Sequence, residues 1–227
     1  MVNCTPPESQ CILLFLRVPE LGKVKTRLAA DLGPEHTLSL YKRFVRDTLE
    51  TLHKTGYPVI LCVHPAEGAQ QARKWLGSDY VFRPQRGKDL GEKMAEAFRH
   101  AFSIGCTHAL LLGTDVPMIT PPVIDMGFEN LASRGTVIGP CIDGGYYLIG
   151  FRNDTFLPAI FPDMPWGTSR ILEITLDRFR DHGQVVHRLP VLQDIDDYQD
   201  LQALWAATGE ARTTAHRTLK FLDRIIN

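Results

Sequence analysis

The sequence predicts an α/β protein of three layers, with a mostly parallel, mixed sheet covered by helices on both faces. The first observation is alternation, because short apolar runs typical of buried strands alternate with segments of helical periodicity from residue 11 onward. The second is a change of rhythm after Thr136, where two short strand-like runs follow one another with no helical pattern between them. Alternation predicts parallel strands joined by crossover helices, and the adjacent pair predicts at least one antiparallel strand.

The first half of the chain contains four expected strands and three expected helices. Apolar residues recur at helical spacing between Pro34 and Gly56, two residue types that are common at a helix start and just past a helix end. Asp89 with Glu92 forms a capping-box pattern at another helix start. The expected strands are 11–16, 58–63, 80–82 and 107–112, and the expected helices are 34–54, 66–76 and 89–105.

The second half continues with shorter elements. Thr120 before two prolines predicts a helix start with the hydroxyl at the cap. Asp197 with Asp200 predicts a capped helix start. The final run 219–226 has apolar residues at helical spacing, which predicts a helix that packs on the domain or on a second subunit in a homodimer. The other expected elements are strands at 137–139, 146–149 and 185–189 and helices at 169–182 and 197–207.

Bulk properties restrict the class of protein. The length and the absence of a linker-like segment predict a single domain over residues 1–227, with residues 1–10 as a loose tail. The net charge of −1 does not provide the broad basic field that nucleic-acid-binding proteins use, so no nucleic-acid partner is expected. No apolar run reaches the ~20 residues of a membrane span, so we expect a cytoplasmic protein.

A cationic segment follows the first expected strand. Lys23, Lys25 and Arg27, with the hydroxyl of Thr26, lie within five residues. The spacing does not fit a glycine-rich phosphate loop, which needs Ser or Thr directly after the lysine, where Val24 stands. The segment is interpreted as a loop whose side chains neutralise a phosphate or diphosphate. The alternative is a solvated basic turn.

Acidic residues follow later strands and turns. Asp115, in the stretch GTDVP after strand 107–112, suits a metal-bridged phosphate, whereas the alternative is an aspartate that only shapes the turn. Asp197 is sufficient to cap the helix that follows it, which leaves Asp194 or Asp196 available as a second metal ligand. Asp143 before two glycines fits either a hairpin turn or a carboxylate that binds sugar hydroxyls.

Other residue types give weaker indications. The stretch PWGT predicts that Trp166 forms a lid or a wall of the pocket, or alternatively a buried aromatic plug. The eight histidines show no metal-ligand spacing and are interpreted as bystanders. The five cysteines occur without a Cys-x-x-Cys pair, and no Gly-x-Ser-x-Gly elbow is present, so a zinc site and nucleophilic hydrolase chemistry are disfavoured.

Six stretches taken together are more specific than any one of them. In order, they read GKVKTRLA, KDLGEKMAEAF, GTDVP, DGGYYLIG, PWGT and DIDDYQDL. The combination resembles an uncharacterised bacterial family of A-type glycosyltransferase fold, whose members include nucleotide-diphospho-sugar transferases and glycosyltransferases of arsenosugar biosynthesis. The resemblance extends over about residues 11–204. It implies a Rossmann-like sheet that binds a nucleotide sugar and a divalent metal ion, Mg²⁺ or Mn²⁺.

The resemblance also implies roles for individual residues. Asp115 and Asp196 would hold the metal ion, and Asp143 with the glycines after it would line the sugar or acceptor side. If the protein is a glycosyltransferase, Asp143 is our candidate for the catalytic base. Gly113 stands two places before Asp115, so the usual Asp-x-Asp pair of this fold is absent. The implied ligands of the nucleotide, the sugar or the acceptor are Lys23, Lys25, Thr26, Arg27, Gln85, Gly91, Asp115, Gly144, Gly145, Trp166 and Thr168.

Three functions are compatible with these observations. The first is a metal-dependent glycosyltransferase that moves a sugar from a nucleotide-diphospho-sugar donor to a small-molecule acceptor. The second is a nucleotidyltransferase that couples an NTP to a phosphorylated small molecule with release of pyrophosphate, as in the phospholactate guanylyltransferase type. The third is a non-catalytic nucleotide-binding protein. Replacing Lys25 or Arg27 with Ala is expected to weaken nucleotide binding and to leave the fold intact.

Overall fold

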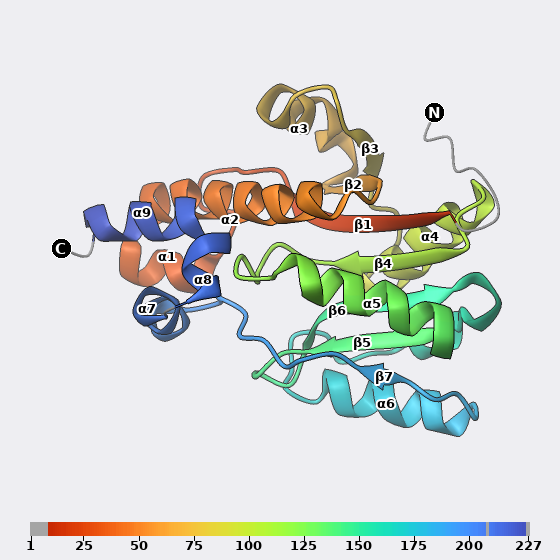
Figure 1. Cartoon of the computed structure of the whole chain (residues 1–227). Helices are drawn as coiled ribbons and strands as arrows, with labels where there is room; N and C mark the ends of the chain where they lie inside the picture. Colours follow the sequence, from red (N-terminus) through yellow and green to blue (C-terminus); the bar gives the residue numbers. More distant parts are fainter. Residues whose placement is uncertain (1–8, 208, 226–227) are drawn as a thin grey trace.

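A seven-stranded mixed sheet runs through the molecule in the order β3-β2-β1-β4-β6-β5-β7 (Figure 1). β6 is antiparallel to both of its neighbours, and the other pairings are parallel. The computed structural model describes residues 9–207 and 209–225. The strands are β1 (Gln10–Arg17), β2 (Val59–His64), β3 (Val81–Pro84), β4 (His108–Leu112), β5 (Thr136–Pro140), β6 (Tyr146–Arg152) and β7 (His187–Arg188). The mostly parallel, mixed sheet predicted from the sequence is confirmed.

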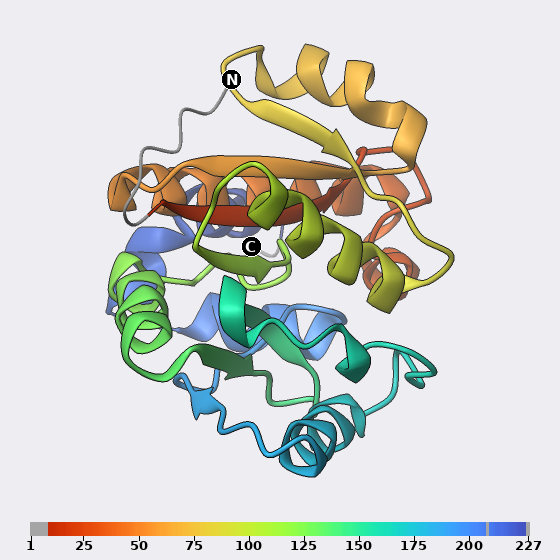
Figure 2. The ribbon, with the colours of Figure 1, turned by 90° about the vertical axis from the view of Figure 1, so that its right-hand side faces the viewer.

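Helices cover both faces of this sheet (Figure 1, Figure 2). α2 and α5 pack on one face, and α4 and α6 pack on the other. The helices are α1 (Thr26–Leu32), α2 (Pro34–Thr55), α3 (Ala69–Leu76), α4 (Leu90–Ser103), α5 (Pro121–Arg134), α6 (Ile171–Asp181), α7 (Tyr198–Ala206), α8 (Glu210–Thr214) and α9 (His216–Ile225). Short 3₁₀ helices span Ala66–Gly68, Asn153–Thr155 and Pro158–Ile160.

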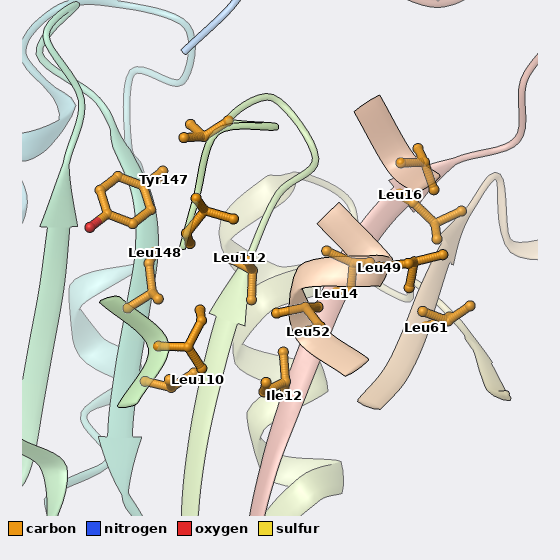
Figure 3. Close-up of a cluster of buried hydrophobic side chains, with 14 of the residues drawn as sticks. Ile12, Leu14, Leu16, Leu49, Leu52, Leu61, Leu110, Leu112, Tyr147 and Leu148 are labelled. Carbon is orange, nitrogen blue, oxygen red and sulfur yellow. The ribbon is translucent and has the colours of Figure 1, made fainter. Parts of the chain in front are cut away.

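β1 shows why both faces must be covered. Ile12, Leu14 and Leu16 belong to one core with Leu49 and Leu52 of α2 (Figure 3). The alternate residues of the strand belong to a second core, which α4 and α6 complete. Because successive side chains of a strand point to opposite faces, an uninterrupted apolar run requires a helical layer on each side. Each large aliphatic side chain that is fully buried contributes about 1.5–3 kcal/mol to the stability of the fold, relative to the same side chain exposed to water.

The C-terminal helices pack on other helices: α8 and α9 contact α2, and α7 contacts α1 and α9 (Figure 1). A third core joins them, with Leu40 and Phe44 of α2, Leu204 of α7 and Leu222 of α9 among its buried members. The sequence left two packing partners open for the run 219–226, the domain itself or a second subunit. In the described part of the chain, this helix packs on the domain itself. Residue 226 lies outside the described residues.

Several expected boundaries differ from the structure. Thr26 and Arg27, predicted in a loop, begin α1, and Lys25 is the residue before the helix. Thr120 precedes α5 but its side chain makes no capping hydrogen bond, because the first-turn prolines already suit the helix start. The expected strand 185–189 is reduced to His187–Arg188, which pair with β5 at the edge of the sheet.

The N-terminal tail ends earlier than the sequence suggests. Gln10 is the first residue of β1, and the buried Ser9 accepts a hydrogen bond from the backbone of Thr107 at 2.8 Å. Residues 1–8 lie outside the described part, so the prediction of a loose tail is not tested there. Within residues 9–207 and 209–225, no helix combines the length and the apolar character that crossing a bilayer requires.

Candidate active site

A cavity of about 690 Å³ opens where the parallel strands end. Arg17 ends β1, His64 ends β2, and Asp115 follows β4, and all three line the cavity. Open α/β sheets bind their ligands at this edge. The predicted site residues that line it are Lys23, Lys25, Thr26, Arg27, Gln85, Asp115, Asp143, Gly145, Trp166, Thr168 and Asp196. Gly91 and Gly144 do not line it.

Lys25 points into the acidic side of this cavity. Its backbone adopts the left-handed conformation (φ 47°, ψ 52°) directly before α1. Its ammonium lies 2.8 Å from Oδ1 of Asp115 and 2.7 Å from Oδ1 of Asp196, and its side chain is only 8% exposed. The ammonium therefore stands between the two carboxylates that the sequence assigns to the metal ion.

Burial and ion pairing have opposite effects on this lysine. Burial lowers the pKa of Lys25, but Asp115 and Asp196 more than compensate, so the pKa lies above its ordinary value. The same ammonium lowers the pKa of Asp196 against the opposing effect of burial. Both charged forms are therefore maintained at neutral pH, and Lys25 fixes Asp115 and Asp196 relative to each other.

The backbone holds the two acidic loops together. The backbone N–H of Ile195 donates to the carbonyl of Asp115 at 2.9 Å, which places the segment 194–196 beside the end of β4. Asp197 and Asp200 form a reciprocal capping box at the start of α7. Asp200 also accepts a hydrogen bond from the backbone of Asp196 at 2.9 Å. The expected helix cap is confirmed, and the cap fixes the segment that carries the cavity's acids.

A second acidic group lies beside the first. Ligand atoms of Cys141, Asp143 and Asp194 lie within 4.8 Å of one another. Asp143 accepts a hydrogen bond from the backbone of Gly145 at 2.8 Å, as expected for an aspartate in the turn between β5 and β6. Burial, the nearby Asp143 and the more distant Asp196 raise the pKa of Asp194 to about 6. Crowded carboxylates of this kind are stabilised by a cation.

The chemistry of these side chains indicates which atoms suit a divalent metal ion. Asp143 and Asp194 present carboxylate oxygens, which Mg²⁺ and Mn²⁺ prefer. Burial, with the nearby carboxylates, raises the pKa of the Cys141 thiol far above neutrality, so it stays protonated and does not suit a hard cation. The pair Asp115 and Asp196 already has an ammonium between its carboxylates. The carboxylates fit a metal ion, and Asp143 with Asp194 fit it best.

The opposite side of the cavity is cationic. Arg17 and Lys93 line it, and neither has a carboxylate partner within 4 Å among residues 9–207 and 209–225. Burial and the nearby positive charges of Lys93 and Arg17 lower the pKa of His64. The Arg17 backbone is held by the buried hydroxyl of Tyr41, which donates to its carbonyl and accepts from its N–H. Asp115, Asp143 and Asp196 form the acidic wall of the cleft, with Asp194 close to Asp143 but not among the lining residues. Arg17 and Lys93 form the basic wall on the opposite side.

Some predicted binding residues have clear structural contacts. The amide nitrogen of Gln85 donates to the carbonyl of Cys62 at 2.8 Å and to that of Leu16 at 3.4 Å, so it braces β1 against β2. A Cβ on Gly91 would lie 2.5 Å from the carbonyl oxygen of Phe161 and 3.0 Å from the ring of Trp166. Gly91 therefore lets α4 approach the cavity wall that Trp166 forms.

Gly144 has a comparable contact at the turn between β5 and β6. Its φ of +90° favours glycine, and a Cβ would lie 2.0 Å from the carbonyl oxygen of Ser169. Its own carbonyl accepts a hydrogen bond from the backbone of Leu172 at 2.9 Å. Gly144 thus joins the turn that carries Asp143 to the start of α6. Whether Gly91 and Gly144 also contact a ligand stays a prediction.

Sequence reasoning missed several residues that line the cavity. His64 was interpreted as a bystander, and its only signal was its position at the end of β2. Tyr41 was assigned to the apolar face of a helix, which gives no indication that its hydroxyl holds the end of β1. The cations Arg17 and Lys93 were not among the predicted ligands. Their position in the predicted elements was again the only indication, because Arg17 ends β1 and Lys93 lies in the first turn of α4.

The fold and the cleft define an α/β protein of the nucleotide-diphospho-sugar transferase type. A family model described as an uncharacterized protein conserved in bacteria (DUF2064) matches residues 48–168, and the chain belongs to this family. A solved structure from Desulfovibrio desulfuricans G20, provisionally assigned as a nucleotide-diphospho-sugar transferase, has a TM-score of 0.90 and 34% sequence identity, with 97% of each chain covered. The family resemblance and the transferase class predicted from the sequence are confirmed. Among curated proteins, no match was found.

Two more distant structures share the fold. The inositol-1-phosphate CTP transferase from T. maritima has a TM-score of 0.53 and 12% identity, covering 93% of this chain and 96% of that chain. The protein Rv0371c from Mycobacterium tuberculosis H37Rv, in complex with manganese, has a TM-score of 0.51 and 15% identity, covering 86% and 97%. At these identities the likeness shows the fold alone, and it confirms the Rossmann-like architecture expected from the sequence.

Proposed function

We propose that the protein is a metal-dependent glycosyltransferase that uses a nucleotide-diphospho-sugar donor. The observation that carries the proposal is the opposition of two charged walls across one cleft. A diphosphate needs cations around its oxygens, and a divalent metal ion needs carboxylates. The basic wall offers the first and the acidic wall offers the second, at the sheet edge where ligands of this fold class bind. The 34% identical relative supports the same donor class.

The basic wall receives the diphosphate in this proposal. Arg17, Lys93 and Lys23 line the cavity, and the Lys23 side chain is 71% exposed although it pairs with Glu20. Arg27, 69% exposed, lies 3.6 Å from Asp196 and extends the cationic surface toward the acidic wall. As the diphosphate departs, negative charge develops on its oxygens, and fixed cations stabilise that charge. Thr26, Gln85 and Thr168 remain predicted ligands at the cavity surface.

The acidic wall receives the metal ion. Asp143 and Asp194 would hold Mg²⁺ or Mn²⁺, with Asp115 beside them. A metal ion bound there supplies a positive charge for the leaving diphosphate. Asp196, predicted as a metal ligand, forms an ion pair with Lys25. We therefore propose that Asp196 acts by holding Lys25 and Asp115 in place.

Lys25 has a positioning role in this proposal. The sequence assigned it to the diphosphate, but its ammonium is buried against two carboxylates and is turned away from the basic wall. The buried ion pairs fix the carboxylate of Asp115 at the cleft before any ligand arrives. Asp143 was predicted as the catalytic base, and a base within reach of the acceptor hydroxyl would raise the rate of transfer.

A nucleotidyltransferase is the second candidate, favoured by the shared fold with the inositol-1-phosphate CTP transferase. Such an enzyme places the same two walls around a triphosphate, and pyrophosphate is the leaving group. The products therefore distinguish the two candidates. Glycosyl transfer releases a nucleoside diphosphate, and nucleotidyl transfer releases pyrophosphate.

The test combines binding with product analysis. The purified protein is screened by thermal shift against UDP-sugars, GDP-sugars and the four NTPs, with and without Mn²⁺. We expect a metal-dependent rise in Tm with at least one nucleotide sugar, and release of its nucleoside diphosphate when acceptors are added. A shift with NTPs alone, together with pyrophosphate release, would establish the second candidate instead. Binding without any turnover would favour a non-catalytic nucleotide-binding protein.

The variant Asp143→Asn separates two roles for this residue. If Asp143 holds the metal ion, the variant loses the metal-dependent rise in Tm with the nucleotide sugar. If Asp143 is only the base, the variant keeps that rise and loses turnover. The control is Asp163→Asn, an exposed aspartate outside the cavity lining.

A further inference from the structure

A second basic site lies on the other side of α2, outside the cleft. A groove of about 420 Å³ is bounded by α2, α9 and the end of α3, and α2 lies alongside α9 (Figure 1). Six basic residues line it: Lys42, Arg43, Arg46, Arg217, Lys220 and Arg224. The groove also contains two aromatic residues, Trp75 and Phe221. Its volume is in the range of small-molecule sites.

Most of these cations have no acidic partner. Arg217 pairs with Asp47 at 3.4 Å and also with Glu50. The other five have no carboxylate within 4 Å in the described part of the chain. Lys220 and Arg224 are four residues apart on α9, a spacing at which like charges destabilise a helix. Within the described residues, the groove therefore concentrates five positive charges that no carboxylate neutralises.

Two further observations indicate a site that is organised before ligand binding. The Arg43 guanidinium donates to the carbonyl of Ser39 at 2.6 Å and lies over the ring of Phe221, 4.1 Å from its centroid. Arg43 is thus held in place among the other cations, and burial with the neighbouring arginines lowers its pKa. Nε1 of Trp75 is buried and has no hydrogen-bond partner within residues 9–207 and 209–225. The Trp75 ring therefore lies at the groove with its own indole N–H unsatisfied.

We propose that this groove binds a small polyphosphate, such as a nucleoside triphosphate or inorganic tripolyphosphate. A chain of phosphates places several negative charges along a few ångströms, which matches cations contributed by two neighbouring helices. The site is recessed and small, and the chain as a whole has a net charge of −1, so it lacks the extended basic surface of a nucleic-acid-binding protein. The proposal does not depend on the chemistry of the cleft.

The test uses tryptophan fluorescence in a background that removes the emission of the cleft tryptophan, so that only changes outside the cleft are observed. The protein has three tryptophans, and Trp166 lines the cleft while Trp75 lines the groove. Trp166→Phe therefore serves as the parent protein. Tripolyphosphate, which has no chromophore, is titrated at physiological salt. We expect a saturable change in emission that is lost when Trp75→Phe is added to the parent.

The decisive variant neutralises three exposed cations of the groove, Arg46→Gln, Lys220→Gln and Arg224→Gln, in the parent protein. Its control neutralises three exposed arginines elsewhere, Arg99→Gln, Arg134→Gln and Arg188→Gln. We expect the groove variant to bind tripolyphosphate at least about tenfold more weakly and the control to bind normally. Equal affinity in all three proteins, or an equal loss in the control, would overturn the proposal. Circular dichroism confirms that each variant is folded.

Calorimetry then compares the two ligand sources by the difference in binding between the parent and its groove variant, because the cleft is unchanged in both proteins. Tighter binding of ATP than of tripolyphosphate would assign the site to a nucleotide, with the aromatic residues holding the base. Equal or weaker binding of ATP would assign it to the phosphate chain alone. In both cases the groove variant must lose the binding that its control retains. A heat signal that persists unchanged in the groove variant counts against the site.

Discussion

The two walls of the cleft differ in how their charges are satisfied. On the acidic wall, Asp115 and Asp196 share a buried ammonium, and the backbone of Ile195 joins the two loops. On the basic wall, Arg17 and Lys93 have no carboxylate partner in the described part of the chain. The pair Asp115 and Asp196 is therefore satisfied without a ligand, whereas the basic wall becomes neutral only when an anion arrives. Changes in the first should affect stability, and changes in the second should affect binding.

The largest effect is expected from Lys25→Met, which removes the buried ammonium and keeps most of its apolar stem. Two carboxylates then remain close together without a cation, and we expect the free energy of unfolding to fall by about 2–3 kcal/mol, because both acids retain some contact with solvent. Urea denaturation measures this change. The matched control is Lys23→Met, whose side chain is 71% exposed, and it should change stability little. Equal effects at both positions would contradict the difference between the walls.

The pH dependence of this effect has a definite sign. The pKa of Lys25 is raised in the folded state, so its contribution is present below its unfolded pKa and is lost as the pH rises through the folded value. The pKa of Asp196 is lowered, so its contribution is present above about pH 4 and is lost as the pH falls. The stability difference between wild type and Lys25→Met should thus be largest between about pH 5 and pH 9.

Gly91→Ala tests whether the basic wall depends on packing. The added methyl group would meet the carbonyl oxygen of Phe161 at 2.5 Å and the ring of Trp166 at 3.0 Å. We expect a loss of about 1–2 kcal/mol and a shift in tryptophan emission. Gly113→Ala is the control, since a Cβ there has no atom within 4 Å. An unchanged Gly91→Ala protein would show that α4 can move away from Trp166 at little cost.

Lys93→Ala tests the basic wall as a binding surface. It removes one cation that has no acidic partner, so stability should stay within about 0.5 kcal/mol of wild type. The affinity for a nucleotide sugar or NTP should fall about tenfold, because one charge-assisted contact to phosphate is lost. Isothermal titration calorimetry measures both proteins under the same salt conditions. A loss of stability with no change in affinity would reverse the assignment of this wall.

Asp194→Asn is expected to have a small effect on stability, and the sign of this effect depends on metal. The pKa of Asp194 is raised in the folded state to about 6, so its charge reduces stability as the pH rises through 4 to 6. Without metal, the variant should therefore be more stable than wild type at pH 7.5, by about 1 kcal/mol. With Mn²⁺, wild type should gain Tm and the variant should not. Equal gains in both proteins would place the metal ion elsewhere.

The fold could be predicted because apolar runs and helix boundaries are local features. The uninterrupted run 11–16 has only one stable arrangement, a strand buried on both faces, and the structure shows it. The acids at strand ends could also be predicted, because Asp115 and Asp143 follow recognisable strands. Position along a strand is enough to predict which residues reach the cleft.

What the sequence could not show is the direction of a side chain that depends on a distant partner. The sequence predicts Lys25 as a phosphate ligand, but one of its two partners, Asp196, is 171 residues away, and the residue adopts a left-handed backbone conformation directly before α1. The prediction that replacing Lys25 leaves the fold intact therefore changes: the structure favours a loss of stability. Gly91 looked like a ligand contact, and its role in packing depends on Phe161. Pairings of this kind become visible only in three dimensions.

The hydrogen bond from Ile195 to Asp115 joins two segments that are synthesised at different times. The family model matches residues 48–168, whereas the acids at 194 and 196 emerge from the ribosome later. A nascent chain that has reached α6 already contains six of the seven strands but still lacks Asp194 and Asp196, the second of which is one of the two partners of Lys25. Since domains fold as synthesis proceeds from the N-terminus, the cleft is completed only near the end of translation. A chain that ends before residue 194 thus lacks the hydrogen bond that joins the two acidic loops.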